Sequence, residues 1–164
     1  MASSAMLQPS DRVSLKTWIG VLGTVLGAFM AVLDIQITNS SLRDIQAALG
    51  ATLEEGSWIS TSYLVAEIVV IPLTGWLSQV FSTRRYLLVN AVLFVFFSVC
   101  CASAWNLPSM IVFRALQGFT GGVLIPMAFT VLLTTLPPSK QPIGMALFAI
   151  TATFAPSIGP TFGG

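Results

Sequence analysis

TWIGVLGTVLGAFMAVLDIQIT, residues 17–38, is an almost unbroken apolar run with one charge near its end. A helix of about 20 apolar residues is what crosses the ~30 Å hydrocarbon core of a bilayer. Four further runs follow, near 58–80, 86–104, 109–133 and 143 to the end of the chain. Hydrophobic residues make up 55% of the 164 positions and charged residues only 8%, whereas a soluble domain has roughly 25% charged residues. The sequence therefore predicts an all-α membrane protein with five transmembrane helices.

The segment before the first span is polar and rich in serine. We expect residues 1–16 to form a disordered cytoplasmic tail and residues 17–164 to form the transmembrane domain. Arg12 and Lys16 precede the first apolar run, so a secretory signal peptide is an alternative for residues 12–38. That run is too long for a signal peptide, lacks an obvious small-residue cleavage site and is followed by four more candidate spans.

The positions of the basic residues predict the orientation in the membrane. Cytoplasmic loops close to the ends of spans carry an excess of Lys and Arg. With a cytoplasmic amino terminus, Arg43 is the single basic residue in an outer loop, and the cytoplasmic ones are Arg12, Lys16, Arg84, Arg85 and Lys140. We therefore expect a multi-pass protein of the cell membrane, in contact with the lipid bilayer, whose amino terminus is cytoplasmic.

The composition argues against several classes of protein. A net charge of +1 with seven scattered Lys and Arg argues against a nucleic-acid partner. The chain has no histidine, and it has no Walker loop, GxSxG or HExxH motif. Cys100 and Cys101 lie together in an apolar run without companion ligands, so we interpret them as small buried hydrophobic residues. We expect no enzyme activity, no metal and no cofactor.

Three ionisable residues fall inside the predicted spans: Asp34, Glu67 and Arg114. Such a group costs at least ~2.5 kcal/mol on insertion scales, so it usually faces the interior of the bundle and serves a function. Glu67 lies nine residues inside Trp58, which at ~1.5 Å per residue places it near the middle of the membrane. It either exchanges a proton there or, when protonated, holds a neighbouring helix as a structural hydrogen-bond donor.

Two helix faces are predicted around these charges. Asp34 shares a face with small residues of the first span, at which a neighbouring helix is expected to approach closely, namely Gly20, Gly23 and Gly27. The fourth span carries one polar and small-residue face, formed by Arg114, Gln117, Gly118 and Gly121. Counted at ~1.5 Å per residue from the span ends, Asp34 and Arg114 lie at the same depth. We therefore predict that these two side chains interact, directly or through water, while a snorkelling arginine remains the alternative.

Four segments carry a family resemblance, in the same order along the chain as in that family. They are LDIQITN at 33–39, GWLSQVFSTRR at 75–85, RALQG at 114–118 and APSIGPTFGG at 155–164. The chain resembles the major facilitator superfamily, and within it the fourteen-span drug:proton antiporters of the EmrB and QacA type. This resemblance covers nearly the whole chain, from about Trp18 to Gly164.

The resemblance implies a role for each segment. Asp34, Glu67 and Arg114 would couple proton movement to transport, with Gln117 and Gly118 completing the fourth-span motif. The loop motif would gate the transporter through a glycine turn at Gly75 and through Leu77, Arg84 and Arg85. The fifth-span antiporter motif is identified with Pro156, Gly159, Pro160, Gly163 and Gly164.

Some positions depart from the family pattern. Gln36 and Arg43 are departures near the first-span motif, and Gln79 and Ser82 stand where the loop motif usually has aspartate and glycine. The loop therefore lacks the acidic group that it usually offers to a neighbouring helix. In the antiporter motif, Ala155, Gly159 and Gly163 form a stripe for close helix packing, although a plain packing helix with two kinks is an alternative.

The fold implied by the resemblance is a major-facilitator-like bundle, with five helices of a truncated amino-terminal half. The last span reaches Gly163 and Gly164 without flanking polar residues, and we expect the chain to be a fragment of a larger transporter. That transporter would exchange protons for a small-molecule, drug-like substrate across a bacterial inner membrane. Its implied partners are the missing carboxy-terminal half and a periplasmic adaptor. A membrane scaffold without transport activity is the alternative; an intramembrane enzyme would need paired catalytic groups that the spans lack.

Overall fold

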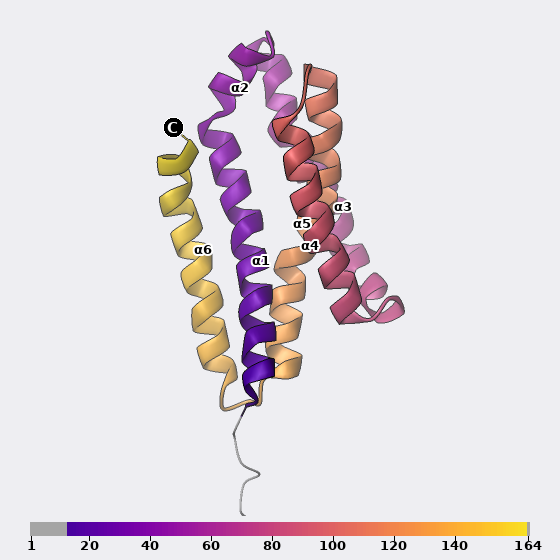
Figure 1. The fold of residues 1–164 in the computed structure, drawn as a ribbon, viewed down its shortest axis with the longest axis vertical. Coiled ribbons are helices and arrows are strands. Elements are labelled where there is room, and N and C mark those ends of the chain that lie inside the picture. The colour runs from indigo at the N-terminus through magenta and orange to yellow at the C-terminus, as the bar shows by residue number, and fades with distance from the viewer. Residues whose placement is uncertain (1–12, 164) are drawn as a thin grey trace, which may run out of the picture.

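The computed structural model describes residues 13–163 and shows a bundle of helices (Figure 1). The described part contains six helices and no strand: α1 (Leu15–Ser40), α2 (Leu42–Ala48), α3 (Leu53–Val80), α4 (Thr83–Ala102), α5 (Leu107–Thr135) and α6 (Gln141–Gly163). All except the short α2 are long and apolar enough to cross a membrane, which makes five candidate spans among these residues. The predicted all-α fold and number of spans are confirmed.

Each of the five long helices begins before the apolar run that predicted it. α1 begins at Leu15, so the last two residues of the predicted tail are helical, and residues 1–12 lie outside the described part. α3 begins at a capping box in which Thr52 and Glu55 bond to each other's backbone N–H groups, and Asn106 and Ser109 start α5 in the same way. Polar capping residues thus extend both helices by several residues beyond their apolar stretches.

α5 is the central helix of the bundle. It packs against α3, α4 and α1, whereas α6 packs mainly against α1 on the opposite flank (Figure 1). Glycines allow α3 to approach closely: a Cβ added to Gly118 would lie 2.3 Å from the carbonyl oxygen of Tyr63, and one added to Gly122 would lie 2.7 Å from Val70 Cγ1. Enclosed in this way, the polar face of α5 is buried at Arg114, Gln117 and Gly118.

The α1–α6 contact uses the small residues predicted for the antiporter motif. Ala155 and Gly159 are buried, and a Cβ on Gly159 would lie 2.3 Å from Gln36 Cβ. The Ser41 hydroxyl donates a hydrogen bond to the carbonyl oxygen of Gly163, which joins the α2 end of α1 to the end of α6. The stripe therefore packs as predicted, and α6 stays helical through Pro156 and Pro160.

Two sequence-based expectations about glycines are wrong. Gly75 lies inside α3, whose helix continues to Val80, so the chain does not turn there. The turn is made by Phe81 and Ser82, and Ser82 adopts φ 64°, a backbone conformation that residues with a Cβ disfavour. Gly20 and Gly23 form no close helix contact, because no atom of the described residues lies within 4 Å of a Cβ placed on either one.

Candidate functional site

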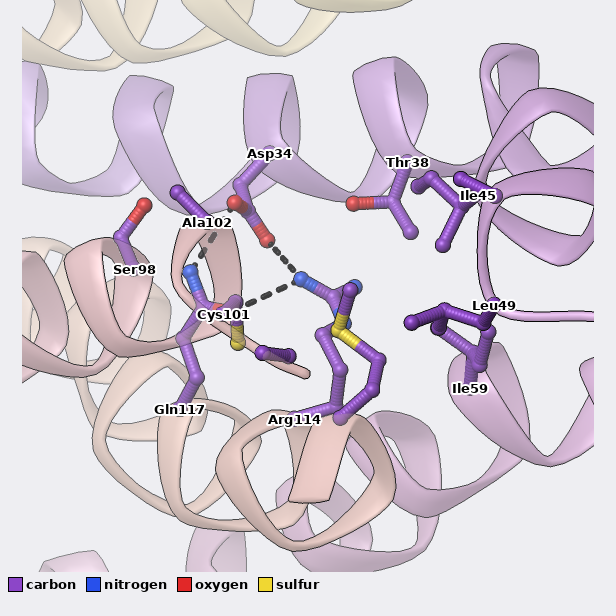
Figure 2. A pocket seen from close by; sticks show the side chains of 13 residues that line it. Asp34, Thr38, Ile45, Leu49, Ile59, Ser98, Cys101, Ala102, Arg114 and Gln117 are labelled. Atoms are coloured by element: carbon purple, nitrogen blue, oxygen red, sulfur yellow. Dashed lines mark hydrogen bonds and ion pairs between the residues drawn. The ribbon is translucent and has the colours of Figure 1, made fainter. Parts of the chain in front are cut away.

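Asp34 of α1 and Arg114 of α5 form an ion pair inside the bundle (Figure 2). Arg114 Nη1 donates to Asp34 Oδ2 at 2.6 Å, and the side chains are 4% and 19% exposed for arginine and aspartate respectively. The predicted contact between these two residues is confirmed. Because α1 and α5 contribute one charge each, any change of charge at this site acts on the packing of the two helices.

Gln117 completes a closed polar triangle with the ion pair. Its amide nitrogen donates to Asp34 Oδ1 at 2.9 Å, and its amide oxygen accepts from Arg114 Nη1 at 2.8 Å. Gln117 lies one helical turn after Arg114, so both side chains project from the same face of α5. Both carboxylate oxygens of Asp34 therefore accept a hydrogen bond, and the fully buried Gln117 fixes the carboxylate relative to the guanidinium.

The ring of Tyr63 on α3 supports the guanidinium from another side. The Arg114 guanidinium carbon lies 4.5 Å from the centroid of this ring, within the range of a cation–π interaction. Tyr63 is held there because the backbones of α3 and α5 lie in close contact at Gly118. Among residues 13–163, Arg114 Nε and the Tyr63 hydroxyl are buried without a hydrogen-bond partner. The site thus stabilises a cation with one carboxylate, one amide and one aromatic face.

A pocket of about 320 Å³ opens beside the triangle (Figure 2). Asp34 and Thr38 line it from α1, Arg114 and Gln117 line it from α5, and Cys101 lines it from α4. The Cys101 thiol lies 3.4 Å from the amide oxygen of Gln117. A pocket of this size has room for several water molecules, each with a share of roughly 30 Å³.

Glu67 lies apart from this triangle. It is half-buried on α3, where its Cγ would lie 2.9 Å from a Cβ added to Gly122 of α5. Within residues 13–163 its carboxyl group forms neither an ion pair nor a hydrogen bond. The structure therefore brings together Asp34 and Arg114 but does not join Glu67 to them, and the structural-glue alternative has no hydrogen-bonded partner in the described residues.

The residues predicted for gating lie at the other end of the bundle. Gly75 and Leu77 lie in the last turns of α3, and Arg84 and Arg85 are exposed in the first turn of α4. A Cβ on Gly75 would meet no atom within 4 Å.

The residues of the antiporter motif lie on α6. Gly159 and Gly163 face α1, Pro156 and Pro160 are exposed, and Gly164 lies outside the described residues.

Sequence reasoning missed two neighbours of the triangle. Tyr63 lies one helical turn before Glu67, so it shares the inward face of α3, and a buried arginine needs an aromatic or acceptor partner of this kind. Cys101 was interpreted as a plain hydrophobic residue, and no sequence signal marks its contact with Gln117. Both contacts depend on which helices pack against α5.

Comparison with known proteins shows which family the sequence matches. The family model of the Major Facilitator Superfamily matches residues 24–164. The colistin resistance protein EmrB of Acinetobacter baumannii is 44% identical over 147 residues, which are 90% of this chain and 29% of that protein. The multidrug export protein EmrB of Haemophilus influenzae is 40% identical over 87% of this chain and 28% of its own length. That of Escherichia coli K12 is 39% identical over 85% of this chain and 27% of its own length.

This chain therefore spans less than a third of the length of the curated relatives that it matches. Within that span, the family match begins inside α1 and includes every residue of the Asp34–Arg114–Gln117 triangle and the whole of α3, α4 and α5. Because this match covers most of the chain, the chain belongs to the Major Facilitator Superfamily.

Proposed function

We propose that this chain forms the amino-terminal part of a proton-coupled antiporter that exports drug-like, amphipathic solutes by alternating access. The observation that carries the proposal is the closed triangle of Asp34, Arg114 and Gln117 between α1 and α5. The names of its relatives, which include multidrug export proteins, support the choice of solute class. The whole transporter would need a carboxy-terminal half, and a periplasmic adaptor is a further proposed partner.

Protonation of Asp34 is the proposed coupling step. The carboxylate balances the Arg114 charge in a largely buried site, so the two charged groups hold α1 and α5 together. A proton on Asp34 removes that balance and turns one acceptor oxygen into a donor. The guanidinium then gains more from other acceptors or from water, which biases the helix pair towards another packing.

Glu67 is the proposed second titratable group of the transport cycle. It lies near the middle of α3, half-buried against α5, without a partner among the described residues. A carboxyl group in this position binds a proton without breaking an existing ion pair. Gly75, Leu77, Arg84 and Arg85 would act in gating, at the end of the bundle away from the triangle.

Solute export driven by a proton gradient tests the coupling proposal. The full-length protein encoded by the gene is reconstituted in vesicles, and accumulation of a fluorescent organic cation is followed from pH 6 to 8. We expect Asp34→Asn to reduce transport to the level of protein-free vesicles and Glu67→Gln to weaken it several-fold with normal membrane insertion. Asp44→Asn, at an exposed carboxylate of α2, is the matched control.

Two other results would argue against this scheme. Full transport by Asp34→Asn would remove the triangle from the coupling mechanism, and transport by Glu67→Gln that is unchanged across this pH range would leave Glu67 a structural role. If the 164-residue chain carries no flux while a product of a longer reading frame does, the chain acts as part of a transporter. A stop codon directly after Gly164 would instead favour a membrane remnant without transport activity.

We further propose that the protein lies in a bacterial inner membrane with its amino terminus and the α3–α4 turn in the cytoplasm. The proposal rests on the distribution of basic residues. In a background in which Cys100 and Cys101 are replaced by serine, a membrane-impermeant thiol reagent added outside is expected to label Thr52→Cys and to miss Ser82→Cys. The reverse labelling pattern would overturn the orientation.

A further inference from the structure

Arg84 and Arg85 begin α4 without an acidic partner. Both side chains are exposed, and the ion pair formed within residues 13–163 involves neither of them. The sequence explains why: every Asp and Glu of the chain lies at or before Glu67, so α4, α5 and α6 carry no carboxylate. Gln79 occupies the position at which the loop motif of the family usually has aspartate. The two arginines therefore have no acidic partner among residues 13–163 and are free to bind an anion.

A groove of about 590 Å³ lies beside these arginines. Arg85, Ser82 and Asn90 form its polar part, and Phe81, Val89 and Leu93 form apolar walls. Phe81 and Val89 are 57% and 55% exposed, so the walls are open to the surroundings of the bundle. The groove thus joins a cationic end to an exposed apolar surface at the start of α4.

The first turn of α4 adds further donors at the polar end of the groove. Ser82 precedes the helix but makes no side-chain capping hydrogen bond, so the first N–H groups of α4 have no side-chain partner at this position. Free N–H groups at a helix start favour a bound anion. The buried Asn90 donates to the Tyr86 carbonyl at 2.8 Å, and the Tyr86 ring packs against the core residues Val70, Val123 and Met127. The floor of the groove is therefore held in place.

We propose that this groove binds an anionic glycerophospholipid of the leaflet on the Arg84–Arg85 side, which is the cytoplasmic leaflet in the proposed orientation. The phosphate lies against Arg85, with Arg84 adding charge, and one acyl chain follows Val89 and Leu93. Arginine binds phosphate with two donors in a fixed fork, and basic pockets between transmembrane helices on the cytoplasmic side are typical lipid headgroup sites. The exposed apolar walls favour a lipid over a free anion, because a free anion leaves them uncovered.

Lipid binding to the 164-residue chain in detergent tests this site directly. Native mass spectrometry is used to titrate phosphatidylglycerol against the chain, with phosphatidylcholine and inorganic phosphate as comparison ligands. A Lys or Arg near the membrane surface changes the affinity for anionic lipid by about fivefold, so Arg85→Gln is expected to weaken phosphatidylglycerol binding by about that factor. Arg84→Gln with Arg85→Gln is expected to remove the preference over phosphatidylcholine.

Two further variants separate the groove from general surface charge. Lys140→Gln removes a basic residue at the same end of the bundle but away from the groove, and binding is expected to stay unchanged. Val89→Trp keeps both arginines but fills the apolar part of the groove, and binding is expected to fall. Circular dichroism and gel filtration confirm that each variant is folded.

Four outcomes would overturn the proposal. They are equal binding of phosphatidylglycerol and phosphatidylcholine, equal losses for Arg85→Gln and Lys140→Gln, unchanged binding by Val89→Trp, and displacement of phosphatidylglycerol by inorganic phosphate at equal concentration. The assay measures binding without transport. A failure of drug export therefore does not argue against the lipid site, and failure of the lipid-binding assay does not argue against proton coupling.

Discussion

The two ends of the bundle handle positive charge in opposite ways. Towards the α2 end, Arg114 is almost completely buried and is balanced inside the chain by Asp34, Gln117 and the Tyr63 ring. At the α3–α4 turn, Arg84 and Arg85 are exposed and have no acidic partner among the described residues. A buried cation requires a partner from the protein, whereas an exposed one at a membrane surface uses water and lipid.

This difference separates two kinds of response. In the proposed mechanism, the Arg114 end changes when a proton reaches Asp34, because the balancing charge belongs to the chain itself. The α3–α4 end is proposed to change with its surroundings, since Arg84 and Arg85 have no acidic partner among the described residues. Backbone packing also differs between the two ends. The helices are closely packed around Gly118 near the ion pair, while Gly75 near the α3–α4 turn faces open space.

The largest expected effect comes from disturbing the close helix packing around Gly118. In Gly118→Ala the new Cβ would lie 2.3 Å from the Tyr63 carbonyl oxygen, a backbone atom that cannot rotate away. We expect a loss of about 3 kcal/mol in the free energy of unfolding, as for a strongly overpacked core. Unfolding in mixed micelles with increasing dodecyl sulfate measures it. Gly75→Ala is the control and is expected to lose nothing, because that position is open; equal losses would show that the two ends pack alike.

A smaller effect is expected for the interaction energy between the charged residues. A double-mutant cycle with Asp34→Asn and Arg114→Gln is expected to give a coupling energy of about 2 kcal/mol, within the range for residues in direct contact. The same cycle with Asp34→Asn and Arg85→Gln is expected to give less than about 0.5 kcal/mol, because distant sites are additive. The same unfolding assay measures both cycles. Coupling of similar size in the two cycles would mean that the ion pair is not a local unit.

The smallest expected effect concerns the strained turn at the exposed end. Ser82 has φ 64°, a conformation that glycine adopts without cost, so Ser82→Gly is expected to stabilise the chain by about 1 kcal/mol. Ser82→Ala keeps the Cβ and is expected to give no such gain. If glycine and alanine have the same effect in the unfolding assay, the turn is not under backbone strain.

Much of the fold was predictable because membrane insertion depends on local properties. Apolar length alone identified the five spans, and the cost of a charge in hydrocarbon identified Asp34, Glu67 and Arg114 as the residues to examine. The Asp34–Arg114 contact was also predictable, since counting residues from the span ends put both at one depth. The small-residue stripe of α6 was predicted as a packing face, and it packs against α1.

Other features needed the positions of neighbouring helices. Gly20 and Gly23 share a helix face with Asp34, yet they face open space among the described residues, because this part of α1 packs against α5 through Val21 and Val25 instead. Glycine at position 75 was predicted to turn the chain, but a glycine inside a membrane helix keeps its hydrogen bonds and leaves the turn to Ser82. The Cys101 contact with Gln117 likewise followed from the packing of α4 on α5.

The sequence by itself determined how many helices cross the membrane, which charges are buried with them and that no carboxylate follows Glu67, because these depend on composition along one segment. The tertiary structure alone decided how the buried charges are satisfied. It placed Gln117 between Asp34 and Arg114, put the Tyr63 ring beneath the guanidinium and left Glu67 without a partner in the described residues. The depth of a residue in the membrane follows from counting residues along one helix. A hydrogen bond between helices also depends on how the two helices are rotated and how far apart they lie.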